Sequence, residues 1–446
     1  MNKVTLQQIQ EALKDYKDVG GAKEFFSRLR YPTLSEPLPF GEADRLPEGA
    51  RKLISSIYLI SDCKPPQLFE DVATPSQFRI YHVELNANTF RRSDFRRILE
   101  PFYRRFPQGN NLFVFTLPQK PYKELAFVSP QRLLSTRDGA MGDLKITVRL
   151  RTLRVVREEP YRTDFEILQE IANPPSDPQE IWGRHEAAFN IERVTRKFFD
   201  EYREALYATM DALVEKDPQH MPHNHRFAFA QLLLNRLMVC YFLARKGWMM
   251  DGTGQPLRRY FRWLWKRYNE EKQRNPNGSF HDWLKVLFMD AFNNQHGKIV
   301  SASFLPSDVR SSFQSMPYLN GGLFAELEPD TYHYQVPDSV FANYLFGGDP
   351  DRDPKLLERY NFTIDESRPY DEEMAVDPEM LGKVYESLIA EEERGEAGIF
   401  YTPRLEVDLM CRLSIVEYLH QRCGFERKKL LEFVFLPFNP ETSQPN

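Results

Sequence analysis

The group of residues best suited to ligand chemistry lies near the C-terminal end, in Gly398-Ile399-Phe400-Tyr401-Thr402-Pro403. Glycine permits a close backbone approach or a positive φ. Thr402 is a suitable N-cap, and Pro403 a suitable first-turn residue, for the helix that we predict over 404–421. An aromatic ring, a hydroxyl and a helix N-terminus therefore meet at one place, which could bind a nucleoside or a carboxylate. A plain capped helix is the simpler explanation of these six residues alone.

Two basic stretches in the first third of the chain could contact nucleic acid. The first lies on a helix predicted over 93–106, with Arg91, Arg92, Arg96, Arg97, Arg104 and Arg105. The second follows a strand predicted over 145–156 and its flank, with Lys145, Arg149, Arg151, Arg154 and Arg157. Arg149 and Arg151 share one face of that strand, because side chains alternate along a strand.

A third basic stretch is interleaved with the aromatic residues Tyr260, Phe261, Trp263, Trp265 and Tyr268. Its basic residues are Arg258, Arg259, Arg262, Lys266 and Arg267. Clustered arginine binds phosphate well. We therefore predict that DNA is contacted by Arg258, Arg259, Arg262, Lys266, Arg149 and Arg151. The alternative for each stretch is a solvated charged face over buried rings.

Candidate metal ligands are sparse. His220, His223 and His225 have a spacing that could bind zinc weakly, but no fourth ligand is apparent, and a turn that caps the next helix is the simpler explanation. The four cysteines are scattered and form no Cys-x-x-Cys pair. No metal site is predicted from these residues.

The composition is that of a soluble globular protein with room for two or three domains. The chain has 446 residues, of which 41% are hydrophobic and 28% charged. A net charge of −5 excludes a uniformly basic coat protein but leaves local patches open. A polar N-terminus, few cysteines and no apolar run of about 18 residues predict a cytoplasmic protein without a membrane span.

The hydrophobic periodicity divides the chain into a mixed part and a helical part. Strands are predicted over 56–60, 78–85, 112–117, 125–128 and 145–156. With the helix over 93–106 they make residues 1–158 a mixed α/β domain. Residues 159–300 read as a helical domain, and 301–446 as a helical connector. The predicted fold class is α+β.

Several segments carry a family resemblance when they are taken together. They are Pro317–Phe324, Tyr360–Ile364, Ala375–Glu386, Gly398–Pro403 and Glu406–Met410. In this order they resemble the large gamma-type adenine-N6 DNA methyltransferases. That group includes type IIG restriction–modification enzymes and the methylases of BREX-like phage-defence systems. The resemblance is specific over about 317–420, looser over 180–300 and weak over 1–158.

The resemblance implies a role for the C-terminal motif and also a limit to it. Gly398, Phe400, Tyr401, Thr402 and Pro403 would line an S-adenosylmethionine pocket at the first element of a methyltransferase fold. The family also carries an Asp-Pro-x-Cys-Gly-Ser-Gly type loop for the cofactor and an Asn-Pro-Pro-Tyr type loop for the flipped adenine. Neither is in this sequence. The chain alone is therefore expected to bear no catalytic residue for methyl transfer.

The resemblance also invites a search for a nuclease site, because type IIG proteins often begin with a domain that binds Mg²⁺ through an Asp and a Glu-x-Lys. Here Asp71 precedes Glu84-Leu85-Asn86 at the end of a predicted strand. Glu84 and Asn86 lie on one face of that strand, but Asn86 stands where lysine is expected. An active nuclease, a nuclease remnant and an unrelated α/β module all stay open.

Together these observations predict the N-terminal, non-catalytic portion of an adenine-N6 DNA methyltransferase of restriction–modification or phage-defence type. It would position DNA and close part of the S-adenosylmethionine pocket. Its partners would be DNA and a catalytic methyltransferase half or other defence subunits, and the chain would be a truncation or one half of a split system. The alternatives are a Mg²⁺-dependent DNA nuclease and a protein-interaction module of a defence system.

Overall fold

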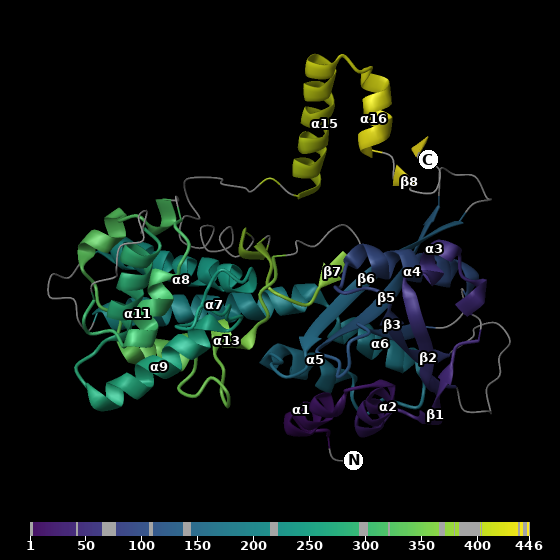
Figure 1. The fold of residues 1–446 in the computed structure, drawn as a ribbon, viewed down its shortest axis with the longest axis horizontal. Helices are drawn as coiled ribbons and strands as arrows, with labels where there is room; N and C mark the ends of the chain where they lie inside the picture. Colours follow the sequence, from purple (N-terminus) through teal and green to yellow (C-terminus); the bar gives the residue numbers. More distant parts are fainter. Residues whose placement is uncertain are drawn as a thin grey trace. The chain divides into compact units, whose positions relative to one another are not determined.

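The structure is a computed structural model. It describes residues 3–41, 43–64, 77–106, 110–136, 144–214, 222–293, 302–319, 322–364, 371–378, 380–382, 402, 404–435, 438–439 and 444–445. The chain forms two compact units, Met1–Pro378 and Glu379–Asn446, and each is described by itself. The α+β class is confirmed, since a seven-stranded mixed sheet precedes a mostly helical region (Figure 1). The domain borders at 158 and 300 stay predictions.

The strands of the main sheet follow one another in chain order. They are β1 (Thr33–Pro39), β2 (Ile54–Cys63), β3 (Phe78–Leu85), β4 (Asn110–Thr116), β5 (Glu124–Thr136), β6 (Leu144–Val156) and β7 (Asp371–Glu373). Two neighbouring pairs, β3–β4 and β6–β7, are parallel, and the others are antiparallel. Helix α4 (Arg92–Arg105) makes the crossover between β3 and β4 that a parallel pair requires.

Two strands of the main sheet were not predicted from the sequence. Strand β1 contains two prolines, which the sequence pattern would assign to a loop, and it is an edge strand, where proline is tolerated. Strand β7 has three acidic residues, a composition that strands disfavour, and its partner β6 lies more than 200 residues earlier in the chain. The strands predicted over 56–60, 78–85, 112–117, 125–128 and 145–156 correspond to β2 to β6.

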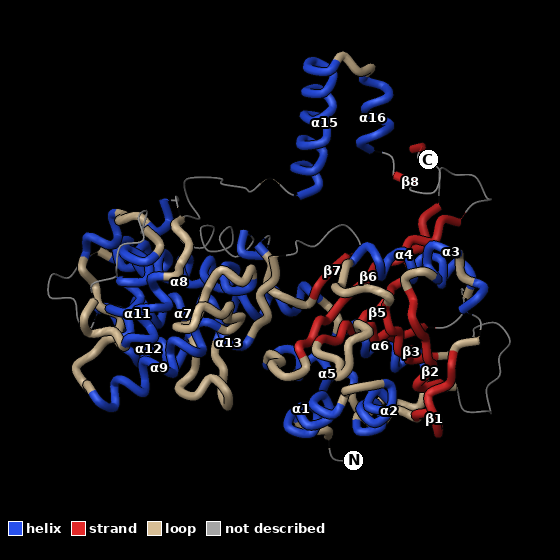
Figure 2. The backbone as a smooth tube through the Cα atoms, in the orientation of Figure 1, coloured by secondary structure: helices blue, strands red, loops and turns tan. Residues whose placement is uncertain are grey.

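Helices cover both faces of the sheet (Figure 2). The flanking helices are α1 (Leu6–Asp15), α2 (Val19–Arg28), α3 (Glu48–Arg51), α4, α5 (Arg162–Ile171) and α6 (Pro178–Ala188). Ile80, Leu112 and Val114 pack with side chains of α1, α2, α5 and α6. Val83 and Phe113 pack with α4 on the opposite face. Because β4 is buried on both faces, its side chains are apolar at successive positions.

The helical part of the first unit is built around α8. Its elements are α7 (Ile191–Val214), α8 (His223–Arg245), α9 (Tyr260–Arg274), α10 (Phe280–Lys285), the π-helix η2 (Val286–Ala291), α11 (Ser307–Gln314), α12 (Asp338–Val340), the π-helix η5 (Phe341–Leu345) and α13 (Leu356–Arg359). Short 3₁₀ turns are η1 (Ala43–Arg45), η3 (Gly322–Phe324) and η4 (Glu328–Tyr332). By length and composition α8 could cross a membrane, but 67% of its apolar window is buried, as in a core helix.

The Pro317–Phe324 segment, which carries part of the family resemblance, has a structural role in its described residues. The buried Arg236 guanidinium donates from Nε to the Leu323 carbonyl at 2.8 Å and forms a two-bond ion pair with Asp330. Asn293 donates to the Phe324 carbonyl at 2.6 Å. These bonds hold the segment against α8 and the end of η2.

The second unit is described mainly by a pair of packed helices, α15 (Arg404–Cys423) and α16 (Arg427–Phe435). Two short strands follow, β8 (Phe438–Asn439) and β9 (Gln444–Pro445). Helix α15 confirms the helix predicted over 404–421. Gly424 has a φ of 69°, which suits the turn after a helix, and Arg427 binds Glu417 through two hydrogen bonds across that turn. The sequence also predicts a helix over 377–393, most of which lies outside the described residues.

Candidate nucleic-acid interface

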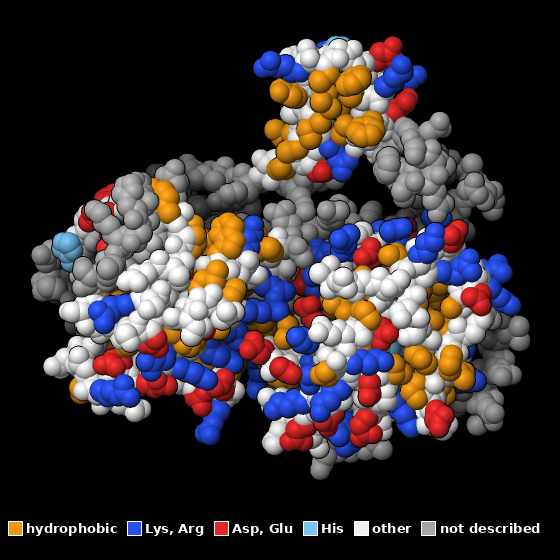
Figure 3. All heavy atoms as spheres, viewed as in Figure 1, with side chains coloured by type: hydrophobic (Ala, Val, Ile, Leu, Met, Phe, Trp, Pro, Cys, Tyr) orange, Lys and Arg blue, Asp and Glu red, His pale blue; other side chains and the backbone are white. Residues whose placement is uncertain are grey.

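A cleft of about 1390 Å³ opens within the first unit, beside the N-terminal half of α9. Helix α1, residues 158–162 and the loop 350–354 form its other walls. Four of the predicted DNA contacts line this cleft, namely Arg258, Arg259, Arg262 and Lys266. Arg259 is the N-cap of α9, and Arg262 and Lys266 follow it within the helix at i+3 and i+7. Figure 3 shows basic and acidic side chains mixed along this border between the sheet and the helices.

Arg259 is the most deeply fixed of the four. Its guanidinium is nearly buried and donates to the carbonyls of Glu159 and Pro160, both at 2.8 Å. The same group lies 3.9 Å from the centre of the Tyr161 ring. A buried cation needs such partners because leaving water is costly. Arg259 therefore joins the helical part to the end of the sheet part.

Arg262 bridges a buried carboxylate and an exposed one. Its Nε donates at 3.0 Å to Glu358, which is 1% exposed and also accepts from the Tyr241 hydroxyl at 2.6 Å. Burial and Glu358 together raise the pKa of Tyr241. On its other side Arg262 lies 2.9 Å from Asp351 and 3.1 Å from the Pro350 carbonyl.

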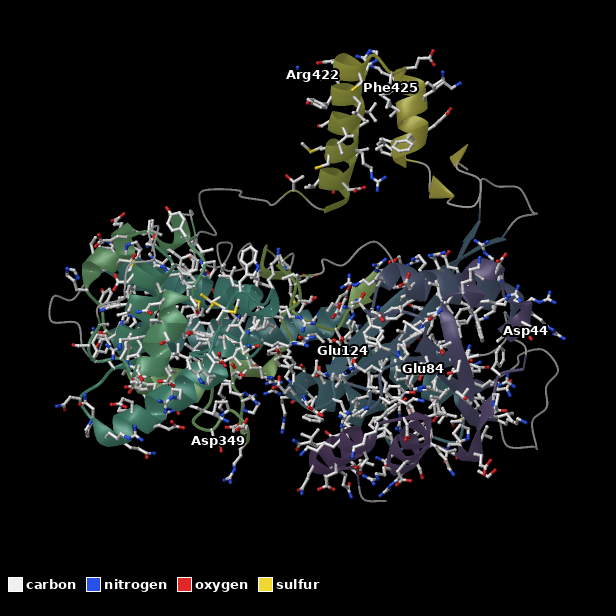
Figure 4. All side chains as sticks on the ribbon, viewed as in Figure 1. Asp44, Glu84, Glu124, Asp349, Arg422 and Phe425 are labelled. Carbon is white, nitrogen blue, oxygen red and sulfur yellow. The ribbon has the colours of Figure 1, made fainter. Side chains whose placement is uncertain are left out.

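Lys266 and Arg258 are the other two predicted contacts that line the cleft. Lys266 pairs with Asp351, and its side chain is 45% exposed. Arg258 lies 4.0 Å from Glu124, one of the residues labelled in Figure 4. Burial raises the pKa of Asp351, but Lys266 and Arg262 outweigh that effect, so the pKa is lowered overall. These cations therefore face exposed or distant carboxylates.

The other two predicted DNA contacts, Arg149 and Arg151, lie elsewhere, at the edge of the sheet. Arg151 donates from Nε to Glu372 of β7 at 3.1 Å, and Arg149 lies 3.6 Å from the same carboxylate. The remaining acidic residues of β7 bind arginines of α4, with Arg92–Glu373 at 2.7 Å and Arg96–Asp371 at 2.6 Å. The structure thus divides the six predicted contacts between two places, and a role in DNA binding stays a prediction for all six.

Glu84 lies at the end of β3, in a hydrogen-bonded group rather than a cluster of carboxylates. It accepts from the Tyr122 hydroxyl at 2.8 Å and from the Ser55 hydroxyl at 3.3 Å, and Lys120 lies 3.7 Å away (Figure 4). Asn86 turns to the Lys52 carbonyl at 3.3 Å. Asp71 lies outside the described residues.

A fully buried histidine stands behind Glu84. His82 Nδ1 lies 3.0 Å from the Tyr16 hydroxyl, and its Nε2 lies 3.3 Å from the Tyr122 hydroxyl. Burial lowers the pKa of His82 to about 3, so the ring is neutral at pH 7. The histidine therefore supports Tyr122, which in turn holds Glu84.

The described surroundings of Glu84 do not fit Mg²⁺. Magnesium sites in proteins use carboxylates and water in an octahedron. Among the described residues there is no group of three His, Cys, Asp or Glu side chains that could hold a metal ion. Glu84 offers one carboxylate, and the ammonium group of Lys120 already neutralises part of its charge.

The predicted S-adenosylmethionine contacts lie almost entirely outside the described residues. Gly398, Phe400, Tyr401 and Pro403 are among those not described. Thr402 is described and exposed, two positions before α15 begins. The cofactor site therefore stays a prediction.

Sequence reasoning missed the acidic partners of both basic regions. Asp351 belongs to the segment Gly347–Pro354, whose Gly, Asp and Pro residues predict only a loop. The Asp371-Glu372-Glu373 run had no strand pattern. Clustered acidic residues were a usable signal in both cases, because arginines that become buried need partners of opposite charge.

The comparisons with known proteins give one relative and no family. The chain is 29% identical over 208 residues to a protein of Methanocaldococcus jannaschii named "putative type II restriction enzyme and methyltransferase". The match covers 45% of this chain and 15% of that protein, so the chain spans a small part of its relative. No family model and no solved structure matches. The likeness supports a relation to restriction–modification proteins.

Proposed function

We propose that this chain is the DNA-positioning, non-catalytic portion of a restriction–modification enzyme that methylates adenine at N6. The observation that carries the proposal is the likeness of nearly half of the chain to a protein named as both restriction enzyme and methyltransferase. The motifs over 317–420 add the adenine-N6 type, and the cationic cleft adds a place for DNA. We include in the proposal both the adenine-N6 specificity and the DNA-binding role of the cleft.

The cleft supports a phosphate-binding role through its geometry. Arg262 and Lys266 project from one face of α9 and share the half-exposed Asp351. Both cations can therefore exchange this carboxylate for a phosphate, and no buried group loses its partner. Arg258 has a carboxylate only at 4.0 Å. Binding would release counterions and would therefore weaken with salt.

The second unit supports the need for a catalytic half. Ten large apolar side chains of α15, α16 and their connection are exposed, from Val407 and Met410 to Phe433 and Phe435. Figure 3 shows them gathered on this helix pair, and Figure 4 labels Arg422 and Phe425 near its turn. Two helices alone bury too little apolar area to be stable, so the proposal assigns this surface to contact with the methyltransferase half.

S-adenosylmethionine would supply the methyl group in the assembled enzyme. In the proposal, Tyr401, Thr402 and Pro403 line one side of its pocket, while the residues that act on adenine come from the catalytic half. The exposed hydroxyl of Thr402 ahead of α15 is compatible with this role. This chain's own residues then bind DNA and orient it.

The test of the proposal is reconstitution. The chain is mixed with a catalytic methyltransferase half, and transfer of labelled methyl groups to duplex DNA is measured. We expect a stable complex and methylation that depends on both components. The absence of both a complex and methyl transfer would overturn the proposal.

A DNA-binding measurement separates this function from a pure interaction module. Replacing Arg258, Arg262 and Lys266 by alanine should weaken binding of a labelled duplex and reduce its salt dependence by about 2 to 3 in the log–log slope. A matched triple change at exposed cations outside the cleft, Lys52, Arg193 and Arg274, controls for net charge. Equal losses in both variants would favour the interaction module.

The nuclease alternative has weaker support, because the described residues around Glu84 supply one carboxylate and a lysine. It predicts Mg²⁺-dependent DNA cleavage that Glu84→Ala abolishes. We expect no cleavage by the pure protein. If the unchanged protein does cleave DNA and Glu84→Ala does not, that result would support the nuclease alternative.

A further inference from the structure

The loop Gly347–Pro354 brings a single carboxylate to two cations of the cleft. Asp351 lies at the tip, 2.9 Å from Arg262, and it also pairs with Lys266. The Pro350 carbonyl accepts from Arg262 at 3.1 Å. The Asp351 carboxylate thus contacts both cations, and the Pro350 carbonyl contacts Arg262. An anionic ligand would make similar contacts with the same two cations.

The loop is built to hold this position. Gly347 has a φ of 104°, and a Cβ there would lie 2.3 Å from the Asp353 carbonyl oxygen, so only glycine fits. The Trp265 indole of α9 donates to the Gly347 carbonyl at 2.9 Å. At the tip, the Asp349 carboxylate accepts from the Asp351 amide at 3.0 Å. Asp351 is therefore pre-oriented toward α9.

The accessibility of the carboxylates distinguishes Asp351 from Glu358, the other partner of Arg262. Glu358 is 1% exposed and receives a second hydrogen bond from Tyr241, so it stays with Arg262 in any bound state. The Asp351 side chain is 50% exposed and faces the cleft. Only the Asp351 pair can be exchanged for a ligand at a small cost in free energy, since exposed ion pairs contribute little.

We propose that Arg262 and Lys266 form a subsite for one phosphate of a nucleic-acid backbone, and that Asp351 occupies this subsite until the phosphate displaces it. The inference rests on the proposed DNA-positioning function and deepens it, because it assigns the position of one phosphate and a residue that weakens its binding. Asp351 makes the cleft select polyanions, which can compete with a carboxylate held in place, over isolated anions.

Asp353 of the same loop provides a matched control. It pairs with Lys355 at 2.8 Å and does not line the cleft. Asp351→Asn and Asp353→Asn change the net charge of the protein equally and keep side-chain size. Any difference in binding between them therefore reports the local pairing with Arg262 and Lys266.

The experiment measures the affinity of a fluorescent duplex by anisotropy over a range of salt concentrations, for the full chain and both variants. We expect Asp351→Asn to tighten binding by about two- to fivefold at low salt, as loss of an exposed competing pair allows. Its salt slope should steepen by about 1, because two cations are then free to meet phosphate. Asp353→Asn should match the unchanged protein within about 1.5-fold.

Three outcomes are distinct. If the unchanged chain binds and Arg262→Ala weakens binding, but Asp351→Asn behaves as Asp353→Asn does, the subsite inference is wrong and the proposed function survives. If Asp351→Asn weakens binding, Asp351 supports the cleft structurally and the inference also fails. If no form of the chain binds duplex or single-stranded DNA, the proposed function itself is overturned.

Discussion

The cleft beside α9 and the sheet edge at β7 use the same residue types in opposite ways. In both places arginines face carboxylates that come from a distant part of the chain. In the cleft the partner of Arg262 and Lys266 is Asp351 on an exposed loop. At the sheet edge Glu373 is 1% exposed and lies between Arg92 and Arg154. The exposure of the carboxylate, more than the number of arginines, separates a surface able to take phosphate from one that holds the fold together.

Asp164 is a buried residue of α5 on which charges of both regions act. Its replacement has the largest expected effect on stability. Burial raises the pKa of Asp164 to about 7, while Arg259 of the cleft lowers it and Glu373 of β7 raises it. The folded state thus binds a proton more tightly than the unfolded state does. The contribution of Asp164 to stability is fully present at about pH 4 and is lost as the pH rises toward 7.

The change Asp164→Asn removes this titration. Relative to the unchanged protein, the stability of the variant should rise between about pH 4 and pH 7, by up to about 4 kcal/mol, and then level off. Chemical denaturation at a series of pH values measures the difference. A stability difference that stays constant over this range would show that Asp164 is ionised in the folded protein.

The sheet edge should respond strongly to loss of its most buried carboxylate. Glu373→Ala leaves Arg92, at 2.7 Å, and Arg154, at 3.8 Å, without that partner. We expect a loss of about 3 kcal/mol in the free energy of unfolding, since breaking a buried pair strands its charge. Glu372→Ala, which removes the more exposed carboxylate on the other face, is the control and should cost about 1 kcal/mol. Equal losses of stability in the two variants would show that burial of the carboxylate does not determine the cost of removing it.

Arg259 is the buried cation of the cleft. Its replacement should affect stability, like a change at the sheet edge, more than it affects DNA binding. Arg259→Lys keeps the charge but loses the planar guanidinium, which lies over Tyr161 and donates to two carbonyls from Nη2. We expect about 2 kcal/mol of destabilisation with little change in the salt slope of DNA binding. A thermal melt and the anisotropy titration test both halves of this expectation. Unchanged stability with weaker DNA binding would place Arg259 among the phosphate contacts.

The sequence was a good guide where one local pattern decides the outcome. Short segments rich in Val, Ile, Phe and Tyr, bounded by turn residues, located β2 to β6, and the i, i+3, i+4 spacing located α4. It could not locate β7, because three acidic residues become a strand only through arginines placed far earlier in the chain. It grouped Arg258, Arg259, Arg262 and Lys266 correctly in space. It could not separate the buried Arg259 from the accessible Lys266, since that depends on Glu358 and Asp351 arriving from a later segment.

The smallest expected effect is that of Lys266→Ala, and its comparison with Arg149→Ala gives the sharpest contrast between the cleft and the sheet edge. Lys266→Ala should weaken DNA binding by about threefold at low salt and reduce the salt slope by about 1, with no measurable loss of stability, because its pair with Asp351 is exposed. Arg149→Ala, which removes one charge from the sheet edge, should leave the affinity unchanged. Arg149 lies 3.6 Å from Glu372, whose side chain is 20% exposed against 50% for Asp351, so a phosphate displaces this carboxylate less readily. If Arg149→Ala weakens binding as much as Lys266→Ala does, then phosphate reaches the sheet edge despite β7, and exposure of the carboxylate is the wrong criterion for telling the two basic regions apart.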